Sequence, residues 1–551
     1  MQDPTPKTSL ALPPRFHALD GAHKVNAILN LPDVRGFVEA LPPDEFYFLV
    51  KDIGPMDAVD LIQYSTPEQR VAFFDFDGWD KDILEPSQVD EWLDVLREAD
   101  RFLPAETLKL LDPEFVSAYL LEFVRAIFDR TEEDEMRVYE SDYEFVMTPD
   151  LDFTLVIDPG LEDVSAGVRR IITLLYQGDP HNARAIMFNC RALLKLEQTE
   201  LAFQFRQSRL ADLGFPTPED AAALYARIDE AAYAAALSRD AAEGDSPYVV
   251  PPVSDAGGRT HLVLSRVRAD DSFLNRVIAR LDAEDRPNAD RFLSDFGSCV
   301  NWAVVASPEG VNFDSSGRVE GLASDVHATV GLALEHLSDA EEGRAVALAR
   351  KAAPLHLHQL GQQLAVRRAI RARALVRRGG SLFGDDLGAF FRALDLRPRP
   401  RFQPPGATLP APFRTPGELH RADELLDAAE AQLQAFETHL GFDLAAFTSF
   451  AFVGLNADDK RFITFETLAR TATARVVLGG APSFDPLTAT ELEGVRRALL
   501  SGGDVLASLP SGVGPALTAL FETSLESLSE TFAELTPPLD PRFFTGVLLA
   551  R

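Results

Sequence analysis

The sequence predicts a mainly α-helical protein, an irregular array of helical repeats with one small β-hairpin. Three observations support this fold class. Prolines recur ahead of apolar pairs in the first quarter of the chain, most later segments repeat apolar residues at intervals of three and four, and one segment alternates with a period of two.

Six short segments near the N-terminus share one pattern, in which two apolar residues follow six and seven positions after a proline. Proline suits the first turn of a helix, because its missing N–H would have no intrahelical partner there. The prolines are Pro43, Pro55, Pro67, Pro86, Pro104 and Pro113, and the pairs are Leu49/Val50, Leu61/Ile62, Phe73/Phe74, Trp92/Leu93, Leu110/Leu111 and Tyr119/Leu120.

These helices are expected to pack on one another. A helix of about ten residues is only marginally stable alone in water, so each needs a neighbour to bury its apolar pair, as in a solenoid. Five of the six prolines are followed by acidic residues, such as Asp44 and Glu45 after Pro43, where the helix dipole favours them. The alternative is six unrelated helix starts within one helical domain.

The segments "LPPDEFYFLVKDI", "GPMDAVDLIQYS" and "TPEQRVAFFDF" resemble the cytosolic N-terminal helical-repeat domain of bacterial magnesium channels over residues 31–125. They resemble the flagellar motor switch protein more loosely. In the channels this acidic domain senses magnesium and precedes nucleotide-binding-type modules and a membrane domain. Only the fold is carried over to this chain. The whole chain is also similar to an uncharacterised family of soluble bacterial proteins, which implies no assigned activity.

The net charge of −33 is concentrated near the N-terminus, since residues 31–163 hold 35 acidic and 10 basic residues. Such an excess repels nucleic acid and anionic lipid, and it attracts cations or basic protein surfaces. We therefore expect a protein partner or self-association, and neither nucleic-acid binding nor membrane insertion. Solubility and helix capping are the simpler explanation of the same charge.

The sequence shows no signal peptide and no apolar run of the ~18 residues that a membrane span needs. Its two cysteines have no CxxC spacing. We expect a cytoplasmic protein, without disulfides or structural zinc.

Changes in composition divide the chain into six segments. They are an N-terminal tail and leading helix (1–30), the acidic proline-started repeats (31–135), a β-hairpin followed by helices (136–245), a central helical domain (246–396), a proline-rich linker (397–416) and a C-terminal helical domain (417–551).

The hairpin is predicted within residues 136–158, with helix expected up to Arg130 and again from Leu161. The alternation has a period of two and is broken by Thr-Pro-Asp, as expected for two strands and a turn. One face of the first strand would carry Tyr143, Phe145 and Met147, and one face of the second would carry Leu151, Phe153, Leu155 and Ile157.

Four aspartates, Asp75, Asp77, Asp80 and Asp82, are expected to crowd one loop. Carboxylate oxygens are the ligands that magnesium and calcium prefer. The EF-hand pattern is not met, because Gly78 is not at the sixth position and no Glu stands at the twelfth. The alternative is a solvated loop with a helix cap. We expect no cofactor, with magnesium or calcium at this loop as the one metal candidate.

Four arginines, Arg367, Arg368, Arg371 and Arg378, fall within one quadrant of a predicted helix. Nucleic-acid binding is disfavoured, since no aromatic residues alternate with them and the chain is acidic. We consider a solvated helix face and, as a hypothesis, a surface that docks on acidic residues elsewhere in the same assembly.

The chain contains none of the GxxxxGK[ST], HExxH, GxSxG or GxGxxG motifs. His356 and His358 are two residues apart, which on a helix directs them away from a shared metal. We therefore expect a non-catalytic cytosolic interaction or regulatory protein that binds a partner through its acidic helical repeats. The alternative is a magnesium-sensing protein, or a metal-dependent enzyme, that uses the Asp75–Asp82 loop.

Overall fold

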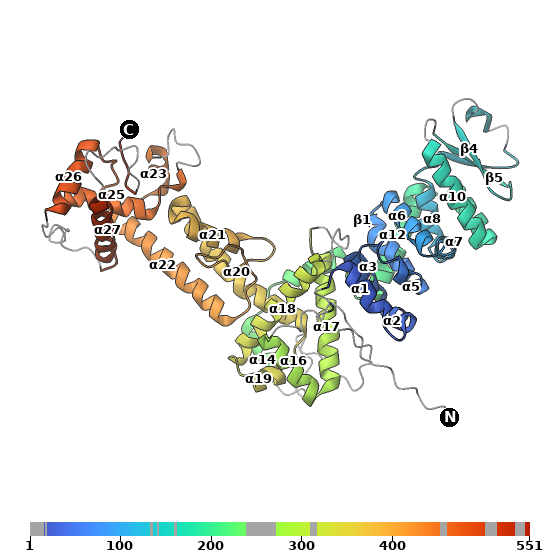
Figure 1. The fold of residues 1–551 in the computed structure, drawn as a ribbon, viewed down its shortest axis with the longest axis horizontal. Helices are drawn as coiled ribbons and strands as arrows, with labels where there is room; N and C mark the ends of the chain where they lie inside the picture. Colours follow the sequence, from blue (N-terminus) through green and yellow to red (C-terminus); the bar gives the residue numbers. More distant parts are fainter. Residues whose placement is uncertain are drawn as a thin grey trace. The chain divides into compact units, whose positions relative to one another are not determined.

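The computed structural model describes residues 16, 19–132, 136–139, 143–158, 162–238, 271–308, 317–451, 460–501, 515–534 and 546–550. These residues are mainly helical with two small sheets, which confirms the predicted fold class (Figure 1). They form two compact units. Unit 1 lies within Met1–Ala226, Ala235–His327 and Glu342–His356, and unit 2 lies within Arg227–Ala234, Ala328–Glu341 and Leu357–Arg551.

The elements of the chain as far as residue 238 are α1 (Gly21–Leu29), α2 (Val34–Ala40), α3 (Pro43–Ile53), α4 (Val59–Ile62), α5 (Pro67–Asp77), β1 (Trp79–Asp80), β2 (Ile83–Leu84), α6 (Pro86–Ala99), α7 (Leu103–Leu108), α8 (Pro113–Leu120), β3 (Ala126–Asp129), η2 (Arg137–Tyr139), β4 (Glu144–Met147), β5 (Phe153–Ile157), α10 (Glu162–Gly178), α11 (Pro180–Ala192), α12 (Lys195–Asp212), α13 (Pro218–Ala221), η3 (Ala222–Tyr225) and α14 (Glu230–Ser238). The elements labelled η are 3-10 helices.

The later elements are α16 (Phe273–Glu284), α17 (Arg286–Val305), α18 (Gly317–Ser338), α19 (Glu342–Ala349), α20 (Pro354–Gly379), η4 (Gly380–Phe383), α21 (Gly384–Asp395), α22 (Pro416–Leu440), α23 (Leu444–Ala451), α25 (Phe465–Val477), α26 (Ala489–Leu500) and α27 (Pro515–Glu534).

Proline begins most of the short N-terminal helices, as predicted. It is the first residue of α3, α5, α6 and α8 and the second residue of α7. Pro55 is different, because it stands in the turn that precedes the four-residue α4. A proline can therefore mark a turn in this array as well as a helix start.

The apolar pairs after these prolines form much of the core of unit 1. Eleven of their twelve residues are at most 4% exposed. The ring of Phe73 on α5 stacks on Trp92 of α6, with centroids 4.2 Å apart. Leu110 is the exception at 44% exposed, because α7 ends at Leu108 and leaves Leu110 in the following turn. Neighbouring helices thus bury one another's pairs, as a stacked array requires.

Buried polar side chains tie successive repeats together. The Gln69 Nε2 on α5 donates to the carbonyl oxygens of Val38 and Leu41, at 2.7 and 2.8 Å. Arg70 Nε donates to Thr107 Oγ1 of α7 at 3.1 Å. Each contact satisfies polar groups that would otherwise be buried without a hydrogen bond. Leaving such a group unsatisfied costs about 1–3 kcal/mol of stability.

The predicted hairpin is present, with β4 antiparallel to β5 and Val146 opposite Leu155. A third strand, β3, pairs with the other edge of β5, so the order is β3-β5-β4. The expectation of helix up to Arg130 is therefore wrong, since α8 ends at Leu120 and β3 begins at Ala126. Local sequence missed β3 because a short apolar run fits helix or strand equally well.

The two hairpin strands differ in the burial of the faces predicted for them. Phe153, Leu155 and Ile157 of β5 are buried as expected. In β4 the buried residue is Val146, whereas Met147 is 52% exposed. The face predicted to carry Phe145 and Met147 is therefore the less buried face of β4, and Val146 lies on the other face.

Residues 397–416 lie inside unit 2, because the chain before them and the chain after them both belong to that unit. They therefore do not link the two units. They are largely non-helical, as their prolines suggest, but Phe402 bridges Ala411 and both Phe402 and Phe413 are buried. Their rings stack at 5.2 Å. The predicted segment boundary at residues 245 and 246 and residues 133–135, at the end of the predicted repeats, lie outside the described residues. In the part of the chain that the structure describes, no helix combines the length and apolar character that a membrane span requires.

Two adjacent leucines test the stacked array. Leu111→Ala should destabilise unit 1 by about 2–5 kcal/mol, because it opens a cavity at a buried position. Leu110→Ala, its exposed neighbour, should change stability by no more than about 0.5 kcal/mol. Urea unfolding followed by circular dichroism measures both variants. Equal effects at the two positions would contradict the packing described for the pairs.

Candidate interaction surface

The four aspartates of the predicted metal loop do not share one loop. Asp75 and Asp77 lie in the last turn of helix α5 and are 4% and 5% exposed. Asp80 and Asp82 are exposed on the two-residue hairpin of β1 and β2. The helix and the hairpin thus separate the four carboxylates into a buried pair and an exposed pair.

Helix α12 holds the first buried carboxylate. Arg209 binds both oxygens of Asp75, through Nε at 2.8 Å and Nη2 at 2.7 Å, and it also reaches Asp112 at 2.6 Å. Arg206 Nε donates to the backbone oxygen of Asp75 at 2.6 Å. Burial opposes the charge on Arg209, but its hydrogen bonds with Asp75 outweigh this and raise its pKa. Burial still raises the pKa of Asp75 in spite of these bonds, and the pairing joins α12 to the repeats.

Three neighbours hold the second buried carboxylate. Asp77 accepts hydrogen bonds from Tyr47 Oη at 2.5 Å, Lys51 Nζ at 3.0 Å and Trp92 Nε1 at 3.0 Å. The donors come from α3 and α6, so Asp77 joins three repeat helices. Protein donors occupy the oxygens that a cation would need. Among the described residues, no group of three or more His, Cys, Asp or Glu is arranged to hold a metal ion.

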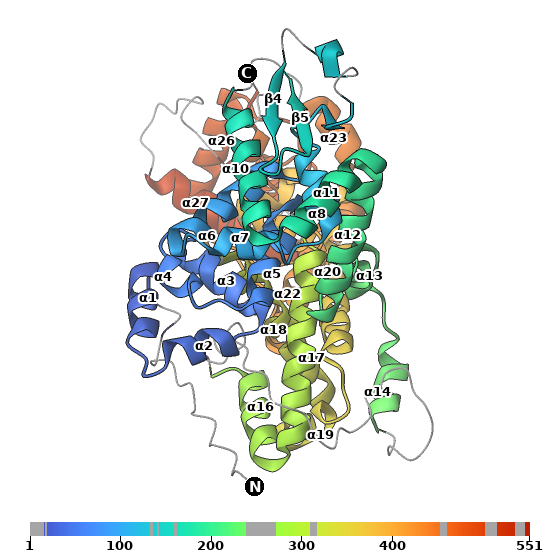
Figure 2. The ribbon, with the colours of Figure 1, turned by 90° about the vertical axis from the view of Figure 1, so that its right-hand side faces the viewer.

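Helix α12 carries an exposed apolar stripe beside its buried face. The stripe begins at Leu194, the residue that caps the start of the helix and is 70% exposed. It continues with Leu201 and Phe205, which are 37% and 43% exposed. The three residues are seven and four residues apart, which places them along one face of a helix. We call these three residues the α12 ridge. The buried Gln198 and Ala202 lie on the adjacent face, and α12 packs along α8 (Figure 2).

The connection between α11 and α12 exposes further large apolar side chains. Leu193 and Leu196 are 39% and 79% exposed, and Phe188 of α11 is 56% exposed. The exposed Glu197 and Glu200 of α12 lie among these residues in the sequence. Exposed apolar side chains that cluster in this way are typical of protein–protein contact surfaces.

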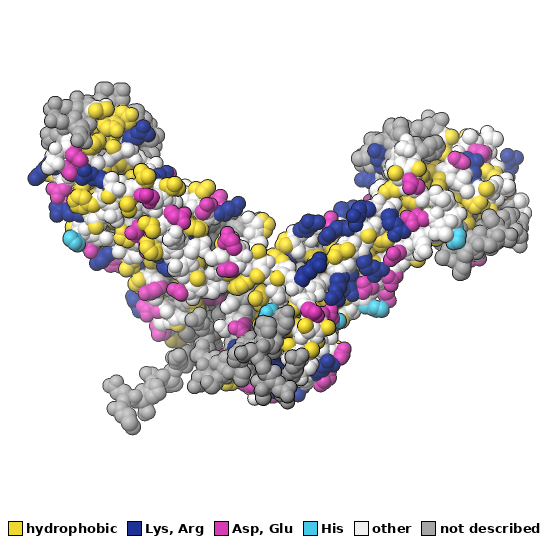
Figure 3. All heavy atoms as spheres, turned by 180° about the vertical axis from the view of Figure 1, so that it is seen from behind, with side chains coloured by type: hydrophobic (Ala, Val, Ile, Leu, Met, Phe, Trp, Pro, Cys, Tyr) yellow, Lys and Arg dark blue, Asp and Glu magenta, His cyan; other side chains and the backbone are white. Residues whose placement is uncertain are grey.

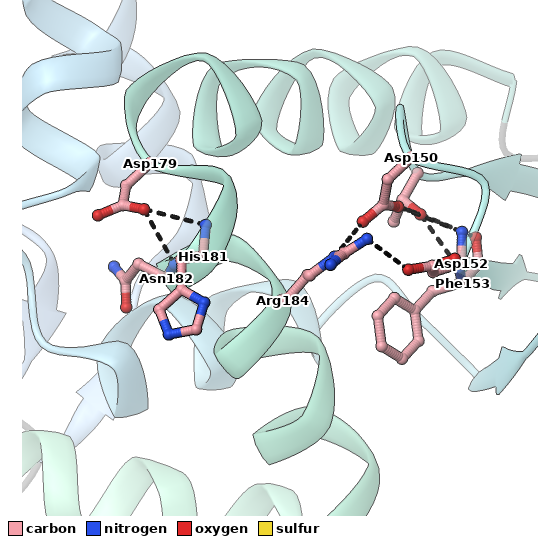
Figure 4. A network of polar contacts seen from close by, with 8 residues as sticks. Asp150, Asp152, Phe153, Asp179, His181, Asn182 and Arg184 are labelled. Carbon is pink, nitrogen blue, oxygen red and sulfur yellow. Dashed lines mark hydrogen bonds and ion pairs between the residues drawn. The ribbon is translucent and has the colours of Figure 1, made fainter.

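Helix α11 is fixed to the sheet by two arginines on one helical face. Arg184 binds Asp150 and Asp152 of the β4–β5 turn at 2.7 and 2.5 Å (Figure 4). Arg191 binds Asp129 and Glu132, after β3, at 2.8 and 2.5 Å. Between Arg184 and Arg191 in the sequence, the ring of Phe188 contacts the ring of Phe153 edge-on, with centroids 5.1 Å apart. Phe153 is labelled in Figure 4.

The start of α11 is capped in the usual way. The Asp179 Oδ1 accepts hydrogen bonds from the backbone N–H groups of His181 and Asn182, at 3.0 and 3.2 Å (Figure 4). This cap satisfies donors that have no partner within the helix. It fixes the helix start from which Arg184 reaches the β4–β5 turn.

The carboxylate of Asp150 is strongly perturbed in this contact. Burial favours its neutral form, but hydrogen bonds from Thr148 at 2.6 Å and from Arg184 outweigh that effect and lower the pKa of Asp150 to about 2. The carboxylate is thus charged at pH values well above 2.

The predicted arginine face lies on α20 in unit 2, and acidic residues of the same chain contact it. Arg368 pairs with Asp423 of α22, Arg371 pairs with Asp427 at 2.5 Å, and Arg378 pairs with Glu437. Arg367 pairs with Glu230 at 2.8 Å. In the structure these arginines thus contact acidic residues of the same chain, three of them on α22, which lies in the predicted C-terminal helical domain.

Sequence reasoning did not identify the α12 ridge. The segment "KLEQTELAFQFRQSRLAD" was assigned to a helix, but its exposed side was not separated from its buried side. The available signal was an apolar arc wider than a single stripe, together with Arg206 and Arg209 at core-facing positions. Such a helix carries more apolar side chains than one buried face can hold, so some of them remain exposed.

Comparisons with known proteins identify one relationship. The chain matches the model of a family of unknown function (DUF6178) over residues 14–550. No curated protein and no solved structure matches it. The match covers nearly the whole chain, as expected from the similarity to an uncharacterised family, and it does not bear on the resemblance of residues 31–125 to magnesium channels.

The pKa of Asp150 predicts a pH dependence. Because its folded pKa of about 2 lies below the unfolded value of about 3.9, its contribution is complete above pH ~4 and is lost as the pH falls towards 2. Asp150→Asn should lower Tm at pH 6 by ~2–4 °C, or about 1 kcal/mol after discounting for solvent screening. The difference from the wild-type protein should shrink below pH 4. Asp158→Asn, at an exposed carboxylate after β5, is the control and should show no such trend.

Melting in divalent salts tests the metal hypothesis. Because protein groups already hold Asp75 and Asp77, millimolar magnesium or calcium should shift Tm no more than sodium chloride at equal ionic strength. A specific rise, abolished by Asp80→Asn with Asp82→Asn, would instead support a cation site at the β1–β2 hairpin.

Proposed function

We propose that this chain, which belongs to the family of unknown function just described, is a non-catalytic interaction protein whose unit 1 binds a basic, partly apolar protein surface. The observation that carries the proposal is the α12 ridge, which stays exposed on a helix anchored to the acidic repeats. Cytoplasmic location and a regulatory role belong to the same proposal.

The acidic repeats supply the charge of the proposed contact. Many of their carboxylates pair with bases of α10–α12, yet others remain exposed. The exposed acidic residues of the repeats are Asp33, Glu39, Asp57, Asp60, Glu68, Asp80, Asp82, Glu91, Glu98, Asp100 and Glu106. A field of this sign attracts basic partners and speeds their association, and salt weakens it.

The ridge supplies the apolar part of the contact. Fully burying a Leu or Phe side chain contributes about 1.5–3 kcal/mol, and these three are roughly half exposed. Covering them would contribute on the order of 3 kcal/mol, equivalent to about 100-fold in an affinity. Charge attraction alone, between solvated groups, would contribute less.

Divalent-cation sensing or metal-dependent catalysis through Asp75–Asp82 is the alternative function. It rests on the spacing of the four aspartates and on the resemblance to magnesium channels, and melting in divalent salts tests it. The interaction proposal rests on separate residues, so either can fail alone.

A ridge variant of the full chain tests the interaction. Leu194→Ser, Leu201→Ser and Phe205→Ser together should weaken partner binding about 100-fold, while circular dichroism shows folded protein. Immobilised full chain captures partners from a lysate of the source organism, and titration of the captured partner measures the affinity.

The matched control carries the same number of exposed apolar substitutions elsewhere in unit 1. Met56→Ser, Phe102→Ser and Val138→Ser alter side chains that are 57%, 58% and 83% exposed, and this variant should bind as the wild-type chain does. If the ridge variant binds the partner as tightly as the wild-type chain does, the proposed surface is refuted.

A further inference from the structure

Helix α20 has a second exposed face beside the one that grips α22. Ile370, Arg373 and Arg377 are spaced by three and four residues along it. The Arg373 Nε binds Asp395 at 2.6 Å, which places the end of α21 beside this face. Arg392 is three residues before Asp395 on α21, and Leu396 and Arg397 follow it.

We call Ile370, Arg373, Arg377, Arg392, Leu396 and Arg397 the basic face. Figure 3 shows Lys and Arg side chains gathered over this part of unit 2, with apolar side chains between them. Residues 354–414 hold 11 basic and three acidic residues, in a chain whose net charge is −33. The basic face holds four of these arginines beside one carboxylate, Asp395, so it is positive in an acidic chain.

Three of its four arginines have no acidic partner within the part of the chain that the structure describes. There, Arg377, Arg392 and Arg397 pair with no acidic side chain, and Arg377 Nε donates only to the backbone oxygen of Arg373 at 3.3 Å. Ile370 and Leu396 lie among them at 49% and 45% exposed. The basic face thus offers both charge and apolar area.

The neighbouring face of α20 shows what such arginines bind. Arg371 and Arg378 grip Asp427 and Glu437 on α22, an acidic helix in the same unit. An occupant of the basic face should be of the same kind, an acidic helical surface with apolar side chains. Unit 1 carries such a surface, where Glu197 lies between Leu194 and Leu201 on α12, beside the acidic repeats.

We propose that the basic face of one copy of this chain docks on the α12 ridge and acidic repeats of a second copy. The proposal rests on the function proposed for unit 1 and names the partner. Two different surfaces meet, so the contact is head-to-tail, and each copy can bind one neighbour at each surface.

A protein occupant suits the basic face better than nucleic acid does. A polyanion would meet the repulsion of the remaining negative charge. Ile370 and Leu396 also provide aliphatic area, whereas binding to single strands relies on aromatic stacking.

Sedimentation velocity of the full chain over a range of concentrations tests the contact. At ~0.05 M NaCl the wild-type chain should form species larger than a monomer that grow with concentration, and at ~0.5 M NaCl they should be lost, because salt screens the charges. Arg377→Glu, Arg392→Glu and Arg397→Glu together should abolish association at all concentrations.

Two further variants serve as a charge-matched control and as a second test of the basic face. Arg421→Glu, Arg461→Glu and Arg497→Glu make the same charge change at exposed arginines of unit 2 outside the basic face, and this variant should associate as the wild-type chain does. Ile370→Ser with Leu396→Ser leaves the charge intact and should weaken association at least tenfold. If the arginine variant fails to fold, this second variant decides the matter.

Mixing separates the two surfaces. The arginine variant retains its ridge, and the Leu194→Ser, Leu201→Ser and Phe205→Ser variant retains its basic face. Each should be monomeric alone, and their mixture should form one-to-one complexes that grow no further. The complex should be lost when both partners carry the arginine substitutions.

Three results would overturn this proposal. They are a monomeric wild-type chain at low salt, association that the arginine variant leaves intact, and tight binding of a labelled single-stranded oligonucleotide that only the arginine variant loses. If the wild-type chain is monomeric but the ridge still captures another protein, the function proposed for unit 1 stands and the second copy is excluded as its partner.

Discussion

The ion pair between Arg209 and Asp75 governs the organisation of unit 1. Asp75 is 4% exposed, and burying a carboxylate without a partner would cost several kcal/mol. Both of its oxygens are bound by an arginine 134 residues away in the sequence. Arg206 lies on the buried face of α12 with Ala202 and Leu210, and this rotation leaves Leu201 and Phe205 beside that face. The exposed ridge thus follows from the rotation of α12 that brings Arg206 and Arg209 to Asp75.

The same principle recurs across the chain. The acidic repeats are followed by helices that carry Arg170, Arg184, Arg191 and Arg209, and these pair with carboxylates of the repeats and the sheet. In unit 2, the arginines of α20 pair with acidic residues of α22. Acidic and basic residues that are segregated along the sequence are thus brought together in space. The surfaces left without such partners are those to which we assign binding.

Local physics explains which parts of the fold were predictable. Proline at a helix start and acidic residues in the first turn act within a few positions, so the start of α5 at Pro67 could be found from sequence. Alternation located β5 for the same reason. The strand β3 was missed, because its short apolar run becomes a strand only by pairing with β5. Asp75 and Asp77 were placed in a solvated loop, because no local signal shows which carboxylates acquire buried donors.

The sequence by itself determined the helical class of this protein, the proline-marked starts of its short helices and the segregation of its charge, because these depend on residues adjacent in the chain. Only the tertiary structure decided which acidic residues are buried, which helix the α20 arginines grip and which apolar side chains of α12 stay exposed. Those outcomes depend on partners far away in the sequence, such as Arg209 for Asp75 and Asp423 for Arg368. A side chain's own type and its near neighbours do not specify a partner at that range.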